Sequence, residues 1–194
     1  MAKTKEQLLN ILDQFQLDEK VVSAEPFGNG HINDTLKVTN EKGEIKYVLQ
    51  RINHLIFTNV DMLQNNIHVV TTHIRKKLEE KGETDIDRKV LTFLPTKDGK
   101  KYYFDGDSYW RVCLFIPRSK SYEEVTPELS YEAGKAFGDF QTMLSDIPEG
   151  TLGETIPDFH NMEFRLKQLR DAVATNAAGR VAEVQYYLDE IEKR

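Results

Sequence analysis

The sequence predicts an α+β protein in which an antiparallel sheet comes first and a group of helices follows. Strand-like runs joined by glycine-containing turns occupy residues 21–117, and one long helical pattern interrupts them. From Thr126 onward the apolar residues recur only at helical spacing. Alternation with a period of two indicates strands, and a period of 3.6 indicates helices. The chain is therefore expected to contain a sheet-rich part and a helical part.

The first elements are a short helix and three strands. A helix is expected from about Lys5, because Leu8, Leu12 and Phe15 recur at helical spacing. Strand-like runs follow at 21–27, 35–39 and 45–52, and residues 40–43 (Asn-Glu-Lys-Gly) form a hairpin signal between the last two. These three runs predict an antiparallel meander.

A long helix should interrupt the sheet over residues 61–80, ending at Gly82. Its apolar face is formed by Leu63, Ile67, Val70, Ile74 and Leu78. Two further runs at 89–95 and 101–117, broken by turn signals at 97–99 and 105–107, are rich in Tyr, Phe, Val and Trp, residues that favour strands. The first part is therefore predicted to be a five-stranded sheet with one helix inserted after the third strand.

The domain organisation follows from a change of composition after Pro117. Residues 1–117 form the predicted sheet lobe, and the polar stretch 118–126 forms a linker. Residues 127–194 form a partial helical lobe, whose first helix has Thr126 as its cap and Pro127 at its first position. Two more helices are expected near 162–173 and 181–191.

Composition limits the function classes. The 194 residues are 39% hydrophobic and 30% charged, and no apolar run approaches the roughly 18 residues of a membrane span, so neither a membrane protein nor a disordered chain is expected. No secretory signal is recognised, so the protein is expected to be cytoplasmic. A net charge of −6 argues against nucleic acid as a partner. The histidines show no zinc-like spacing with Cys113, so no structural metal is expected.

The most informative segment is the loop from Pro26 to Thr35, which contains Gly28 and Gly30. Glycines let backbone N–H groups approach an anion closely, as in phosphate-binding loops. In dinucleotide and Walker-type sites such a loop leads into a helix, whereas here it leads into a strand. An ordinary hairpin turn is the alternative. His31 is a candidate donor to a phosphate or a sugar hydroxyl, and Asp34 a candidate acceptor; the alternative is turn chemistry, in which Asn33 or Asp34 binds its own backbone.

A glycine loop between two strands, then a third strand, a helix and further strands, is the order of a kinase nucleotide lobe. Four ordered segments carry a resemblance to a known family: 28–35 (GNGHINDT), 47–53 (YVLQRIN), 109–116 (YWRVCLFI) and 155–161 (TIPDFHN). Together they resemble the aminoglycoside/choline-kinase-like phosphotransferase superfamily, and within it the bacterial N-acetylhexosamine 1-kinases. The resemblance implies a protein-kinase-like fold and transfer of the γ-phosphoryl group of ATP to the anomeric hydroxyl of an amino sugar.

The resemblance also implies site residues. Gly28, Asn29 and Gly30 would cover the nucleotide phosphates. A cation should reach the phosphates from the third strand, and Arg51 is the candidate, with a surface arginine as the alternative. Strand alternation places Gln50 on the face opposite to Arg51.

The segment after the last strand would form the hinge that recognises adenine through its backbone. It consists of Leu114, Phe115 and Ile116, whose side chains are equally compatible with a place in the core. Trp110 and Arg111 are interpreted as packing and surface residues. Where many kinases carry a helix carboxylate, the matching stretch 62–67 offers amides, of which Asn65 or Asn66 is a candidate to orient the arginine.

The superfamily also needs a catalytic Asp, an Asn and a second Asp that holds Mg²⁺. None of these motifs is recognised. The segment Asp139-Phe140-Gln141 resembles the second Asp motif only superficially, because it lies in the middle of a predicted helix. The chain is therefore expected to be truncated before its catalytic loop, without turnover of its own, and to self-associate through its unfinished helical face. The alternatives are a pseudokinase-like module that binds nucleotide or protein, and a fragment of a kinase for choline, homoserine or an aminoglycoside.

Overall fold

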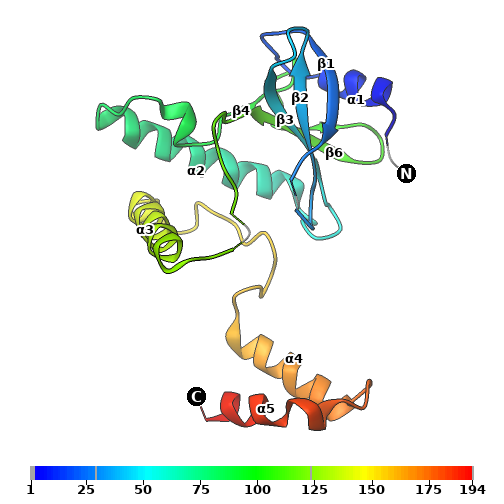
Figure 1. The fold of residues 1–194 in the computed structure, drawn as a ribbon, viewed down its shortest axis with the longest axis vertical. Coiled ribbons are helices and arrows are strands. Elements are labelled where there is room, and N and C mark those ends of the chain that lie inside the picture. The colour runs from blue at the N-terminus through cyan, green and yellow to red at the C-terminus, as the bar shows by residue number, and fades with distance from the viewer. Residues whose placement is uncertain (1–2, 29, 123, 194) are drawn as a thin grey trace. The chain divides into compact units, whose positions relative to one another are not determined.

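The computed structural model describes residues 3–28, 30–122 and 124–193, which form two compact units (Figure 1). The first unit extends to Thr155 and the second begins at Ile156. The predicted α+β class is confirmed: the described residues form an antiparallel sheet of six strands and five α-helices. The predicted lobe boundary at 118–126 stays a prediction. No helix among the described residues is long and apolar enough to cross a bilayer.

The first unit contains the sheet and three helices. Its elements in chain order are α1 (Lys5–Leu12), β1 (Val21–Pro26), β2 (Asp34–Asn40), β3 (Ile45–Ile52), α2 (Val60–Glu80), a 3₁₀ turn (Ile86–Arg88), β4 (Phe93–Leu94), β5 (Tyr103–Phe104), β6 (Tyr109–Leu114) and α3 (Pro127–Leu144). The second unit contains α4 (Met162–Thr175), a 3₁₀ turn (Val181–Val184) and α5 (Gln185–Glu192).

The sheet has the strand order β1-β2-β3-β6-β4, and β5 pairs with β6. The prediction of five strands was wrong because the last predicted run is a hairpin of two strands. Gly106 adopts a φ of +96°, and the Asp105 carboxylate accepts the N–H groups of Asp107 and Ser108 at 3.0 and 2.8 Å. This turn reverses the chain between β5 and β6, in keeping with the turn-forming habit of Asp and Gly.

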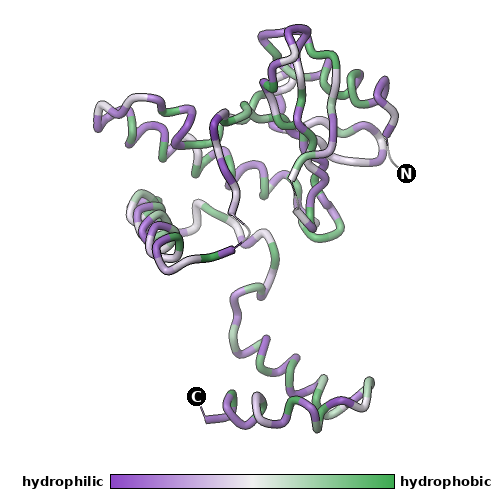
Figure 2. The backbone as a smooth tube through the Cα atoms, in the orientation of Figure 1, coloured by the Kyte–Doolittle hydropathy of each residue, from purple (hydrophilic) through white to green (hydrophobic). Residues whose placement is uncertain are grey.

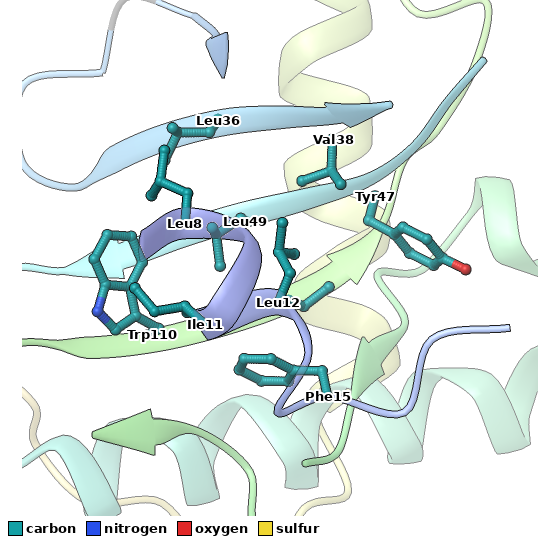
Figure 3. Packing of buried hydrophobic residues seen from close by; sticks show 10 residues of the cluster. Leu8, Ile11, Leu12, Phe15, Leu36, Val38, Tyr47, Leu49 and Trp110 are labelled. Atoms are coloured by element: carbon teal, nitrogen blue, oxygen red, sulfur yellow. The ribbon is translucent and has the colours of Figure 1, made fainter. Parts of the chain in front are cut away.

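One face of the sheet packs against α1, as Figure 3 shows. A capping box starts this helix, since the side chains of Thr4 and Gln7 each bind the other's backbone N–H. The resulting core is formed by Leu8, Ile11, Leu12, Phe15, Leu36, Val38, Tyr47, Leu49, Trp110 and Val112. The predicted helical spacing at the start of the chain thus buries an apolar stripe on the strands.

The helix α2 follows β3 and packs against both the sheet and α3. It begins one residue earlier than predicted, where the Asn59 side chain accepts the N–H of Met62. Near its end, the side chains of His73 and Lys77 both contact Asp146, just after α3. Apolar packing accompanies this contact, with Met143 and Leu144 of α3 lying against Ile74, Leu78 and Val90.

The predicted start of α3 is confirmed, because the Thr126 hydroxyl accepts the N–H of Leu129 and Pro127 lies at the first position. Green and purple alternate along this helix in Figure 2, as expected for an amphipathic element. Apolar side chains in the middle of this helix are nevertheless exposed, 70% for Phe137 and 71% for Tyr131. In the second unit, Arg170 of α4 pairs with Glu192 of α5 at 3.0 Å.

Candidate functional site

The strongest candidate site is a cavity of about 330 Å³ on the sheet face opposite α1. It is built from the end of β1, the middle of β3, the segment around β4, the middle of β6 and the connector after β6. Its lining residues are Phe27, Val48, Gln50, Leu91, Phe93, Arg111, Cys113, Leu114, Phe115, Ile116 and Ser119. The cavity thus brings the start of the predicted glycine loop together with the whole predicted hinge segment.

The strand register determines which side chains reach the cavity. Gln50 of β3 pairs with Arg111 of β6, and Val48 pairs with Cys113. Paired residues of antiparallel strands point to the same face, and neighbouring residues along a strand point to opposite faces. These four side chains therefore share the cavity face, while Leu49 between Val48 and Gln50 lies in the core with α1.

Two aromatic rings connect the loop to the connector. The rings of Phe27, directly before Gly28, and Phe115 meet edge to face, with centroids 5.9 Å apart and an angle of 71°. Such a geometry is favourable for aromatic pairs. Phe27 is 42% exposed, so its ring lies at the mouth of the cavity rather than in a core. Together with Val48 these rings form apolar walls suited to a flat ring system.

Two of the three backbone N–H groups of the connector already have hydrogen-bond acceptors. The N–H groups of Leu114 and Phe115 donate to the carbonyls of Thr92 and Lys46, each at 2.9 Å. Within the described part of the chain, this leaves the N–H of Ile116 as the one of the three that has no hydrogen-bond acceptor. Of the predicted hinge, Ile116 is therefore the residue that can donate to the edge of a base.

The polar end of the cavity is formed by Gln50 and Arg111. The Gln50 carbonyl oxygen accepts from Arg111 Nε at 2.9 Å and from Nη2 at 2.6 Å, and its amide donates to the Thr35 hydroxyl at 2.9 Å. The guanidinium lies 5.3 Å from the centre of the Phe93 ring. Burial lowers the pKa of Arg111, with the neighbouring Cys113 acting in the opposite direction.

Arg111 is thus a cavity residue and not the surface residue that the sequence analysis predicts. The interpretation of Trp110 as a packing residue is confirmed, since it is 2% exposed. Sequence reasoning missed Arg111, although a signal was present: it stands in a strand of largely apolar residues, at the even spacing from Cys113 and Phe115 that puts all three on one strand face. Burial also raises the pKa of the Cys113 thiol to about 11, so the thiol is neutral.

The structure does not bring Arg51 to this cavity. Its guanidinium lies on the other strand face and binds the Asp34 carboxylate, with Nη2 at 2.5 Å and Nε at 2.6 Å. Asp34 is the residue that pairs with Arg51 across β2 and β3. The Asp34 carboxylate therefore accepts from Arg51, and the structure gives it no contact with His31.

The loop between β1 and β2 also borders a second cavity, of about 500 Å³, on the α1 side. Gly28 and Gly30 line it together with Lys3 and Lys5. Gly28 has a φ of +79°, a conformation that glycine adopts without strain. Asn29 lies outside the described residues. His31 is exposed.

The amide stretch at the start of α2 does not contact Arg51. Asn65 accepts from Lys101 Nζ at 3.1 Å, and Asn66 exchanges two hydrogen bonds with the backbone of Gly153. Gln64 is buried, and its amide nitrogen finds no hydrogen-bond partner among the described residues. It borders a third cavity, of about 480 Å³, between α2 and β4, which Arg75 also lines. Among the described residues, no group of three or more His, Cys, Asp or Glu could hold a metal ion.

A comparison with protein-family models finds none that matches the chain. The geometry of the Phe27–Phe115 cavity is therefore the basis for a functional proposal.

Proposed function

We propose that the first unit is the nucleotide-binding lobe of an ATP-dependent phosphotransferase. The observation that carries this proposal is the cavity itself, in which Phe27 at the start of the glycine loop, β3 and the connector after β6 meet around apolar walls and one polar end. A site of this kind, largely apolar with a few polar groups, is typical of a pocket for a ring-containing ligand. A flat purine fits between Phe27, Val48 and Phe115, with the N–H of Ile116 as the donor to its edge.

The class of acceptor is proposed from the four motif segments, which favour the anomeric hydroxyl of an N-acetylhexosamine. Choline, homoserine and aminoglycosides are the alternative alcohols. The 194 residues contain no recognised counterpart of the catalytic Asp and of the Mg²⁺ ligands. We therefore propose that they bind ATP without transferring phosphate. Self-association through the exposed face of α3 also remains a prediction.

The binding half of the proposal is tested by calorimetric titration of ATP and of adenosine. Val48→Phe places extra volume in the cavity and should abolish binding of both ligands. Leu55→Phe is the matched control, because Leu55 is 83% exposed and does not line the cavity. Absence of binding to the unmodified chain at millimolar nucleotide, or equal binding by both variants, would contradict the proposed site.

A second candidate is a pseudokinase-like module that holds nucleotide, and the same cavity supports it equally. The two candidates differ in turnover by the protein in its longest natural form. Incubation with ATP, Mg²⁺ and a panel of N-acetylglucosamine, N-acetylgalactosamine, choline, homoserine and an aminoglycoside gives a phosphorylated product only for a kinase. ATP binding without any product favours the module.

A further inference from the structure

Arg111 is a largely buried cation, and within the described part of the chain it has no carboxylate partner. Of the eight arginines among the described residues, four pair with acids, such as Arg51 with Asp34 and Arg75 with Asp87. Among the described residues no carboxylate forms an ion pair with Arg111, and its Nη1 is buried without any hydrogen-bond partner. A buried charge that lacks a counter-charge is costly, so its retention in a cavity wall requires an explanation.

An anion that enters the cavity would relieve this cost. The guanidinium offers five N–H donors in a planar fork, and Gln50 engages only Nε and Nη2. Of the remaining donors, the second N–H of Nη2 suits an oxygen of a phosphate, a group that arginine commonly binds. The low polarity around Phe93 and Cys113 would strengthen such an interaction.

The position of Arg111 along β6 fits the phosphates of a nucleotide whose base lies at the connector. Arg111, Cys113 and Phe115 share one strand face, so Arg111 lies about 13 Å along the strand from Phe115, at about 3.3 Å per residue. Ribose and the first phosphates of an extended nucleotide span a distance of this order. A free anion such as inorganic phosphate could use the same donors.

Gln50 gives this arginine a defined orientation. Its carbonyl oxygen accepts from two guanidinium nitrogens, while its own amide is held by the Thr35 hydroxyl. The third strand therefore contributes a neutral positioning side chain, and the fourth strand of the sheet order contributes the charge. Arg51, also on the third strand, points to the other face of the sheet, where the Asp34 carboxylate neutralises its charge.

We propose that Arg111, oriented by Gln50, is the cation that binds the phosphates of the nucleotide. The identity of the anion rests on the proposed function, whereas the existence of an anion site rests on the geometry of Arg111 alone. β6 thus takes over the charge-neutralising role that the sequence analysis assigns to Arg51 on β3.

The test compares ADP with adenosine, because only ADP carries phosphates. We expect the unmodified chain to bind ADP more tightly than adenosine. Arg111→Leu should weaken ADP binding by about ten- to a hundredfold, the range for a hydrogen bond to a charged group, and should leave adenosine affinity within about twofold. Arg51→Leu is the rival variant, since a phosphate role for Arg51 would give the larger loss there instead.

Gln50→Glu provides a second variant that keeps the arginine. The new carboxylate would pair with Arg111 and repel phosphate, so ADP affinity should fall as in Arg111→Leu while adenosine affinity is retained. Retained adenosine binding shows that each variant is folded. If both variants bind ADP as the unmodified chain does, or if Arg51→Leu alone loses ADP binding, the inference is overturned and the proposed function stands.

Tripolyphosphate separates failure of the inference from failure of the proposed function. If the unmodified chain binds neither adenosine nor ADP, the proposed function fails. Thermal stabilisation by tripolyphosphate that disappears in Arg111→Leu would then still support an anion site at Arg111, with a free phosphate compound as its ligand. No stabilisation by tripolyphosphate, ADP or adenosine would overturn both.

Discussion

Replacing Asp105 by alanine removes the acceptor on which the β5–β6 turn depends. One carboxylate oxygen accepts the N–H groups of Asp107 and Ser108, and the other accepts the indole N–H of Trp110 at 2.8 Å and contacts Lys3 Nζ at 2.8 Å. The Asp105 side chain is only 9% exposed. Few side chains in the described part of the chain serve as many donors.

The expected loss of stability follows from these donors. Trp110 is 2% exposed, so its indole N–H would be left without an acceptor, which costs about 1–3 kcal/mol. The two backbone bonds of the turn contribute about 1 kcal/mol each, although water can replace part of this at the turn surface. Lys3 adds little because its ammonium group can turn to solvent. Asp105→Ala should therefore lower the free energy of unfolding by about 3 kcal/mol.

Urea unfolding measures this loss, and Trp110 is a convenient probe because the chain contains one tryptophan. Far-ultraviolet circular dichroism should give the same midpoint, since fluorescence alone also responds to the loss of the indole hydrogen bond. Asp107→Ala is the matched control in the same turn, because the Asp107 carboxylate accepts a single hydrogen bond, from the Ser108 hydroxyl at 2.9 Å. Equal midpoints for the two variants would refute the reasoning.

The same carboxylate predicts an acid dependence. Burial alone would raise the pKa of Asp105, but its contacts with Lys3, with the N–H groups of Ser108 and Asp107 and with Trp110 lower it to about 2. A folded-state pKa below the ordinary 3.8 adds stability that is present above about pH 4 and is lost as the pH falls towards 2. Stability should therefore decline across that window, less steeply in Asp105→Ala. Identical pH profiles would contradict this assignment.

Two further predictions concern the loop and the core. Gly28→Ala should lower the free energy of unfolding by about 1–2 kcal/mol, because the φ of Gly28 is +79°. Gly30→Ala should be neutral or slightly stabilising, because its new methyl group would approach only Asn33 O, at 3.8 Å. Thermal melts that rank the two variants the other way would contradict the loop geometry. Leu49→Ala should cost about 2–5 kcal/mol, because Leu49 is fully buried between α1 and the sheet; a loss below 1 kcal/mol in urea would contradict its place in the core.

The regular elements could be predicted from the sequence because each rests on local patterns. The hairpin at residues 40–43, the cap at Thr126 and the apolar face of α2 are all visible within a few residues. The turn signal at 105–107 is visible in the sequence, but the run 101–117 was counted as one strand, because two-residue strands are too short to show alternation.

The site could be predicted only in part, for a physical reason. Alternation shows that Gln50 and Arg51 point to opposite faces, but it does not show which face α1 covers. That depends on packing between the start of the chain and β6, which no local pattern contains. Arg111 was overlooked for a related reason, since its burial and its bond to Gln50, 61 residues away, arise only when β3 and β6 pair.

The core between α1 and the sheet has a consequence for how the chain folds during synthesis. The helix α1 leaves the ribosome well before β6, yet its partners include Trp110 and Val112 of that strand, about a hundred residues later in the chain. Contacts of such high sequence separation form late, because a long loop must close before they contribute. Leu8, Ile11 and Leu12 can pack against β1, β2 and β3 first, but their core stays incomplete until β6 emerges, and in that interval the nascent chain is open to chaperones and to aggregation.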